Sequence, residues 1–116
     1  MLTWREDGFS NPGWHIPGGI IRYKEIAASR IIAVAASELG TEVEFEETPI
    51  AINEIIHPSR SNRGHFISLL FKCWITKPLD KSLRYLGGNP KAGEWAWHKH
   101  CPTDLLDLHD VYRKFL

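Results

Sequence analysis

Residues 14–40 read WHIPGGIIRYKEIAASRIIAVAASELG, and this stretch sets the expectation for the whole fold. The apolar run at 14–16 ends at Pro17-Gly18-Gly19, which predicts a short strand that leaves through a tight turn. From about residue 24 to residue 39, apolar side chains recur at helical spacing among alanines. Gly40 follows where a left-handed helix C-cap is expected. The stretch therefore predicts a strand, a turn, a helix and a cap in succession.

Outside this stretch, the pattern predicts further strands and a second helix. Residues 41–46 (TEVEFE) alternate with period 2, as in a half-buried strand. Residues 66–76 form an almost continuous apolar run, which is typical of a central strand buried on both faces. Shorter strands are expected at 2–5, 50–56 and 94–99, and a C-terminal helix from Pro102 or Thr103 to Leu116. This order predicts a mixed α/β layered domain.

Composition limits the classes of protein that this chain can represent. Its 116 residues, 43% of them hydrophobic, suffice for one domain over 1–116. No apolar run approaches the roughly 18–20 residues of a membrane span, and Asp and Glu near the N-terminus do not resemble a signal peptide. The 14 basic and 14 acidic side chains balance, which argues against electrostatic binding to nucleic acid or anionic lipid. Two cysteines cannot form a disulfide framework, so we expect a reducing, cytoplasmic location.

The residues that can carry chemistry gather around the Gly-Gly turn and the helix. Glu25 follows the turn, and Glu38 lies one turn before the Gly40 cap. A glycine turn lets a backbone carbonyl approach a cation, and carboxylates supply the hard oxygen ligands that Mg²⁺ prefers. The spacing therefore suggests a magnesium site, although spacing alone is a weak signal.

These residues resemble the box of the Nudix hydrolases, G-x5-E-x7-R-E-U-x-E-E-x-G-U, where U is a bulky apolar residue. The residues that match the box are Gly19, Glu25, Glu38 and Gly40, preceded by the Trp-x-x-Pro-Gly-Gly with which many members enter it. The residues that depart from it are Ala33 for the arginine, Val34 and Ser37 for two glutamates, and Thr41 for the closing apolar residue. The resemblance implies an α+β, Nudix-type α/β/α sandwich with a mixed sheet.

The thinned box is similar to that of the GDP-mannose mannosyl hydrolase branch, which keeps Glu-Leu-Gly at the end of the helix. Residues 2–5 and 65–71 also resemble strands of that branch. It attacks the sugar carbon, with a Gln metal ligand and a His base in a late loop. Those two positions fall near Lys91 and Ala92 here, and neither matches.

The resemblance also assigns roles to individual residues. Mg²⁺, or Mn²⁺, would be held by the Gly19 carbonyl, Glu38, Glu25 and Glu94, with Glu25 also supporting the loop. Glu94 lies in Gly93-Glu94-Trp95, which resembles the Gly-Glu-Trp of other Nudix enzymes, so Glu94 and Glu38 are the expected catalytic residues, with Glu94 as general base. The arginines expected to bind phosphate oxygens are Arg5, Arg22, Arg60 and Arg63. Solvated surface is the alternative for Arg60 and Arg63, and Arg30 could stand in for the missing box arginine.

Three functions follow as expectations. The first is a Mg²⁺-dependent hydrolase of a nucleoside diphosphate linked to another moiety, such as the nucleotide sugar GDP-mannose. The second is a Nudix-fold nucleotide-binding module that has lost turnover, because two helix carboxylates are missing. The third is an interaction domain without a ligand. Only 18 residues precede Gly19, fewer than Nudix domains normally have there, so we also expect a missing N-terminal strand or a homodimer that covers the gap.

Overall fold

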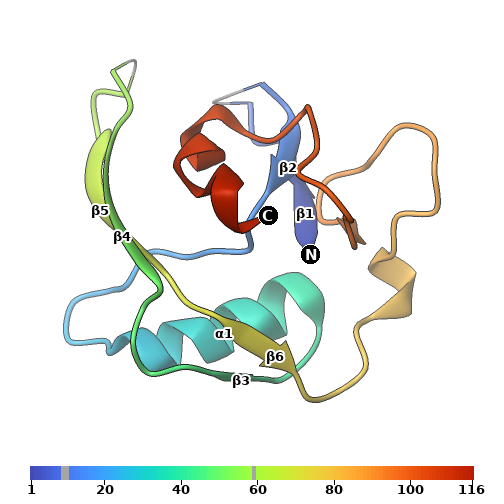
Figure 1. Ribbon diagram of the computed structural model, residues 1–116, viewed down its shortest axis with the longest axis horizontal. Coiled ribbons are helices and arrows are strands. Elements are labelled where there is room, and N and C mark those ends of the chain that lie inside the picture. The colour runs from blue at the N-terminus through green and yellow to red at the C-terminus, as the bar shows by residue number, and fades with distance from the viewer. Residues whose placement is uncertain (9–10, 59) are drawn as a thin grey trace.

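The computed structural model describes residues 1–8, 11–58 and 60–116. Its strands are β1 (Leu2–Arg5), β2 (Gly13–His15), β3 (Val43–Phe45), β4 (Ala51–Ile56), β5 (His65–Leu70), β6 (Cys73–Ile75) and β7 (Trp95–Ala96). Its helices are α1 (Ala27–Leu39) and the 3-10 helices η1 (Lys81–Leu83) and η2 (Asp107–Phe115) (Figure 1). The predicted α+β class is confirmed. No helix in these ranges is long and apolar enough to cross a membrane.

The described strands form three small sheets. β1 lies between β2 and β7 in the first sheet, β3 pairs with β6, and β4 pairs with β5. Every one of these pairings is antiparallel. Within the described ranges, parallel pairing is limited to two isolated bridges, Trp14 with Leu105 and Arg84 with Trp95. The single mixed sheet expected from the resemblance is therefore not formed among these residues.

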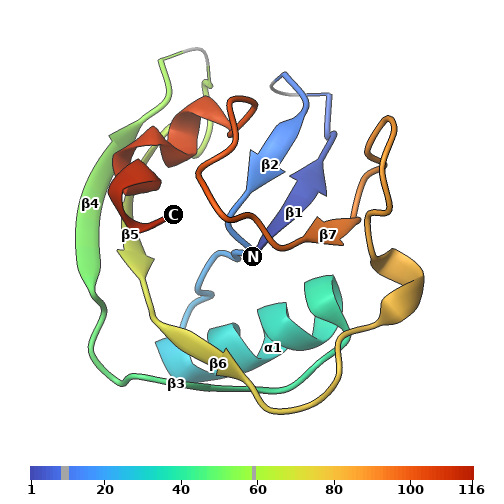
Figure 2. The ribbon, with the colours of Figure 1, turned by 45° about the vertical axis from the view of Figure 1, so that its right-hand side comes forward.

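The β3–β6 and β4–β5 pairs are two halves of one long hairpin, which runs along one side of the molecule (Figures 1 and 2). Phe45 lies opposite Cys73 and Ala51 lies opposite Leu70, so residues 46–50 on one arm face only residues 71–72 on the other. The expectation of one central strand over 66–76, buried on both faces, is wrong. The run is broken at 71–72, and Ile67 is 61% exposed, because a two-stranded hairpin has only one covered face.

Helix α1 is shorter than predicted at its start and ends as predicted. Residue 24 is excluded because Lys24 has a positive φ of 62°, which breaks the helical geometry before Ala27. At the other end, Gly40 adopts the left-handed conformation, with φ 60° and ψ 33°. The Gly40 N–H donates to the Ala36 carbonyl, and the Thr41 N–H donates to the Ala35 carbonyl. The Gly40–Ala36 bond is the single bond of the αL cap motif.

The C-terminal segment and the last strand are shorter than predicted. The expected strand at 94–99 is reduced to β7, and regular helical structure begins only at Asp107, as the 3-10 helix η2. Residues before η2 run beside β2 instead, because the Trp14 N–H donates to the Asp104 carbonyl and the Leu106 N–H donates to the Trp14 carbonyl. η2 therefore lies between the long hairpin and the β1–β2 pair (Figures 1 and 2). Leu2, Trp14 and Leu105 form the buried core beneath it.

Substitution of Gly40 by Ala should destabilise the fold by about 1–2 kcal/mol. The added Cβ would sit in a left-handed backbone conformation and only 2.9 Å from the Asp80 Cβ. Urea denaturation measures the change in the free energy of unfolding. Gly88→Ala is the matched control, since Gly88 also has positive φ but nothing within 4 Å of its added Cβ. Equal losses of the free energy of unfolding in the two variants would show that the contact with Asp80 adds nothing to the destabilisation.

The outer face of the β4–β5 hairpin is apolar and exposed. Alternation places Ile52, Ile56, Ile67 and Leu69 on this face, and they are 38–65% exposed. Glu54 and His65 lie among them and form an ion pair of 2.6 Å. The inner face points toward η2, because the Tyr112 hydroxyl donates to the Ser68 Oγ. Exposed apolar patches of this kind commonly mark contacts between proteins.

These exposed side chains predict a homodimer through this outer face, in place of one that covers the N-terminal gap. An isologous contact would bury the four aliphatic side chains twice, and a face that carries both an acid and a base does not repel its own copy. In sedimentation velocity over a concentration series, Ile67→Lys should abolish self-association. Ile32→Lys is the control, since Ile32 is 54% exposed on α1 instead. A wild type that stays monomeric at every concentration would contradict the dimer, and an Ile67→Lys that still dimerises would contradict this face.

Candidate functional site

A pocket of about 520 Å³ opens between β1, the exit of β2, the last turn of α1 and the segment before β7. Its lining includes Thr3, Arg5, Glu6, His15, Gly18, Ser37, Glu38 and Gly93. Parts of the chain separated by up to 90 residues therefore share one hollow. The Nudix-like stretch contributes both its turn, through Gly18, and its helix, through Ser37 and Glu38.

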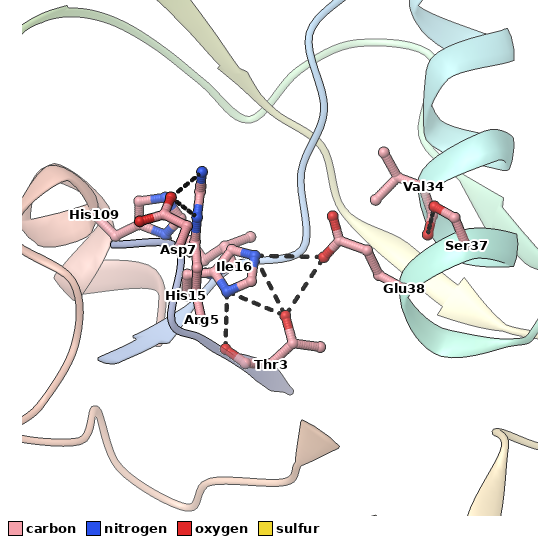
Figure 3. A network of polar contacts seen from close by, with 9 residues as sticks. All are labelled: Thr3, Arg5, Asp7, His15, Ile16, Val34, Ser37, Glu38 and His109. Atoms are coloured by element: carbon pink, nitrogen blue, oxygen red, sulfur yellow. Dashed lines mark hydrogen bonds and ion pairs between the residues drawn. The ribbon is translucent and has the colours of Figure 1, made fainter. Parts of the chain in front are cut away.

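A buried histidine links β1 to the helix in this pocket (Figure 3). Thr3 lies opposite His15 in the β1–β2 pair, so the two side chains project from the same face of the sheet. The His15 Nδ1 lies 2.9 Å from the Thr3 carbonyl oxygen, which can only accept, so Nδ1 is the donor. This bond fixes the ring and directs Nε2 to within 3.4 Å of the Glu38 Oε2. The Thr3 hydroxyl donates to the same Glu38 oxygen at 3.4 Å.

Glu38 projects from the last turn of α1 without the carboxylate neighbours that the family box would supply. Val34 and Ser37 flank it on the same side of the helix (Figure 3). The turn packs tightly against this part of α1, because a Cβ at Gly19 would lie 2.8 Å from the Val34 Cγ2 and 2.9 Å from the Arg30 Cδ. Only glycine fits at this close approach. The helix therefore presents one carboxylate and a polar network in place of a carboxylate cluster.

Glu25 is used within the turn. Its carboxylate accepts three bonds from Arg30, from Nη2 to Oε1 at 2.7 Å, from Nη2 to Oε2 at 2.8 Å and from Nε to Oε2 at 3.0 Å. It also accepts the Arg22 N–H at 2.8 Å. The Arg22 backbone bond and then the Arg30 side chain hold the pKa of Glu25 below its ordinary value. Glu25 thus holds the turn through its bonds to the Arg22 N–H and the Arg30 guanidinium.

Glu94 lies apart from Glu38. Its carboxylate accepts the Lys91 N–H at 2.9 Å and closes a turn, while the neighbouring Gly93 lines the pocket. In the part of the chain that the structure describes, no three His, Cys, Asp or Glu side chains are placed to hold one metal ion. The predicted set of Glu25, Glu38 and Glu94 therefore does not fit a shared magnesium site, and only Glu38 of the three lines the pocket. The carboxylates that line the pocket are those of Glu38 and Glu6.

The four predicted phosphate-binding arginines are also separated. Arg5 lines the pocket, and its Nε donates to the Asp7 Oδ2 at 2.7 Å. Arg60 and Arg63 line a different hollow, of about 420 Å³, in the loop between β4 and β5. Arg22 is exposed beside the Glu25 turn. The structure therefore brings Arg5 together with Glu38 and leaves the other three outside this pocket.

His109 of η2 contacts the site at Ile16 and His15, and no pattern in the sequence pointed to it. Its Nδ1 accepts the Ile16 N–H at 2.9 Å, and its ring centroid lies 5.9 Å from that of His15. Burial, followed by the charges of His15 and Arg5, lowers the pKa of His109 to about 4. Thr3 and His15 were missed as well, because the register that pairs them across β1 and β2 cannot be read from either strand alone.

The stability of the protein should fall as the pH drops from about 6.5 to about 4. In that window the unfolded chain takes up a proton on His109 that the folded protein excludes, which costs up to about 3 kcal/mol. Urea denaturation at a series of pH values measures this slope. The His109→Asn variant lacks the titrating ring, so its slope should be shallower, and an unchanged slope would contradict the assignment.

Comparison of the chain with protein-family models, with curated proteins and with solved structures found no match.

Proposed function

We propose that the pocket binds a nucleoside diphosphate derivative and that the chain is a Nudix-like hydrolase, with nucleotide sugars such as GDP-mannose among its substrates. One observation carries the proposal. Glu38 from the Nudix-like helix and Arg5 from β1 line the same pocket, next to the Gly18 turn and the buried His15. A cation, a carboxylate and a glycine turn in one hollow are the groups that diphosphate recognition and hydrolysis require.

The side chains divide this work by their contacts. Asp7 holds the Arg5 guanidinium in place through Nε and Nη2, and the Arg5 side chain, which lines the pocket, remains 43% exposed and can also meet phosphate oxygens. Glu38 is fixed by Thr3 and His15, so its carboxylate can accept a proton from a bound water at a defined position. We assign this role to Glu38 in preference to Glu94, whose carboxylate is bound within the Lys91 turn.

Magnesium remains part of the proposal, but we assign it fewer protein ligands than the sequence suggests. The three predicted carboxylate ligands are not gathered, so we assign no step to a metal cluster. Mg²⁺ usually keeps several waters and binds one or two carboxylates together with substrate phosphates. When bound, it would neutralise charge on the diphosphate, and Glu38 is the Nudix-box carboxylate that the pocket offers.

A nucleotide-binding module without turnover is the second candidate. The observation that favours it is the separation of Glu25, Glu38 and Glu94, because a binding pocket needs Arg5 and the turn but not a carboxylate cluster. Both candidates bind a nucleotide, but only the hydrolase releases product.

Mg²⁺- or Mn²⁺-dependent release of product from a panel of nucleotide sugars and dinucleotides tests the proposal. Glu38→Gln should lower the rate by about 10²-fold or more, since it removes the proton acceptor and keeps its size. Glu54→Gln is the control, as Glu54 is exposed on β4 and lies outside the pocket.

The panel also separates the alternatives. A wild type that releases no product but is stabilised against heat by a nucleotide would favour the binding module. A wild type that neither releases product nor is stabilised by a nucleotide would refute nucleotide recognition by this pocket. An equal loss of the rate of product release in Glu38→Gln and Glu54→Gln would refute the role of Glu38.

A further inference from the structure

We propose that His109 is a positioning residue for the pocket, through which the C-terminal helix η2 sets the placement of His15 and of the turn that follows it. The inference rests on the proposed function of the pocket, but it concerns a residue outside the Nudix-like stretch. His109 does not line the pocket. It reaches the pocket through one hydrogen bond and one ring contact.

The hydrogen bond lies where the chain leaves β2. Ile16 directly follows the last residue of β2, and its N–H donates to the His109 Nδ1 at 2.9 Å. Pro17 has no N–H, so Ile16 carries the last backbone donor before the Gly18 turn enters the pocket. An acceptor on η2 therefore determines how the turn begins.

The ring contact joins His109 to His15, the last residue of β2. The His109 ring stands 5.9 Å from the His15 ring and 6.3 Å from the Tyr112 ring, measured between centroids. His15 is in turn held by the Thr3 carbonyl and directed at Glu38. A displacement of His109 would therefore be transmitted to His15 and to the proton acceptor of the pocket (Figure 3).

η2 is itself anchored, so His109 acts as a fixed support. The buried Tyr112 donates its hydroxyl hydrogen to the Ser68 Oγ of β5, and the Leu106 N–H donates to the Trp14 carbonyl of β2. Burial keeps the His109 ring uncharged near neutral pH, with Nδ1 bare to accept. Small displacements of groups that act on a substrate have large effects on binding and rate, which is why such a support matters.

Two substitutions separate the acceptor from the ring. His109→Asn keeps an acceptor, because the Asn Oδ1 lies at about the same position along the side chain as the His Nδ1. His109→Phe keeps the ring and removes the acceptor. We measure the dissociation constants of ADP and GDP with Mg²⁺ by calorimetry, and the ¹⁵N shifts of the His15 ring by NMR. We expect His109→Phe to bind at least about 10-fold more weakly with shifted His15 signals, and His109→Asn to stay within about 3-fold of the wild type.

Two further variants test the inference. His100→Phe, at an exposed site, should change neither readout. Tyr112→Phe removes the Ser68 link and keeps the His109 acceptor, so it should shift the His15 signals in the same direction but less, even if His109→Phe does not fold. Unchanged His15 signals in His109→Phe, or in Tyr112→Phe when His109→Phe is unfolded, would overturn the inference. A wild type that binds neither nucleotide would refute the proposed function alone, since the His15 signals still report on positioning.

Discussion

The antiparallel pairing of β1 with β2 is the constraint on which the rest of the site depends. It places Thr3 opposite His15 and Arg5 opposite Gly13, so the hydroxyl, the imidazole and the guanidinium of the pocket have fixed relative positions. β7 pairs with the other edge of β1 and brings the Gly93 turn to the same pocket. A shift of β2 by one residue against β1 would move His15 to the face of the sheet opposite Thr3 and Arg5.

The second constraint is the close approach of the Gly-Gly turn to α1. Gly19 fits against Val34 and Arg30 because it has no Cβ, and the pair between Glu25 and Arg30 closes the turn from the other side. The turn and the helix carry Gly19, Glu25 and Glu38, the residues on which the proposed Nudix-like function rests, and the helix has Val34 and Ser37 where the Nudix box has glutamates. Glu38 is left with Thr3 and His15 as neighbours, which provide polar support where the family would provide further metal ligands.

The C-terminal segment completes the site from a distance. Its backbone runs beside β2, its Tyr112 is linked to β5, and its His109 accepts the Ile16 N–H. The long hairpin, η2 and the β1–β2 pair are therefore connected by hydrogen bonds, and η2 lies between the other two (Figure 2). The outer face of the hairpin remains exposed. A second protein bound there would contact β5, whose Ser68 is hydrogen-bonded to Tyr112 of η2, the helix that also carries His109.

The sequence by itself determined the local elements: helix α1 with its Gly40 cap, the short strands β1 and β2, and a turn that requires glycine. Each depends on neighbours within a few residues, which periodicity and capping rules describe well. Only the tertiary structure decided that 66–76 is a broken hairpin arm, because an apolar run looks the same whether one face or both are covered. It also decided which candidates meet. Arg5 lines the same pocket as Glu38, while Glu25 and Glu94 do not. Thr3, His15 and His109 belong to the site although no sequence pattern indicated them. Strand register and the path of the C-terminal segment are long-range properties that no local pattern encodes.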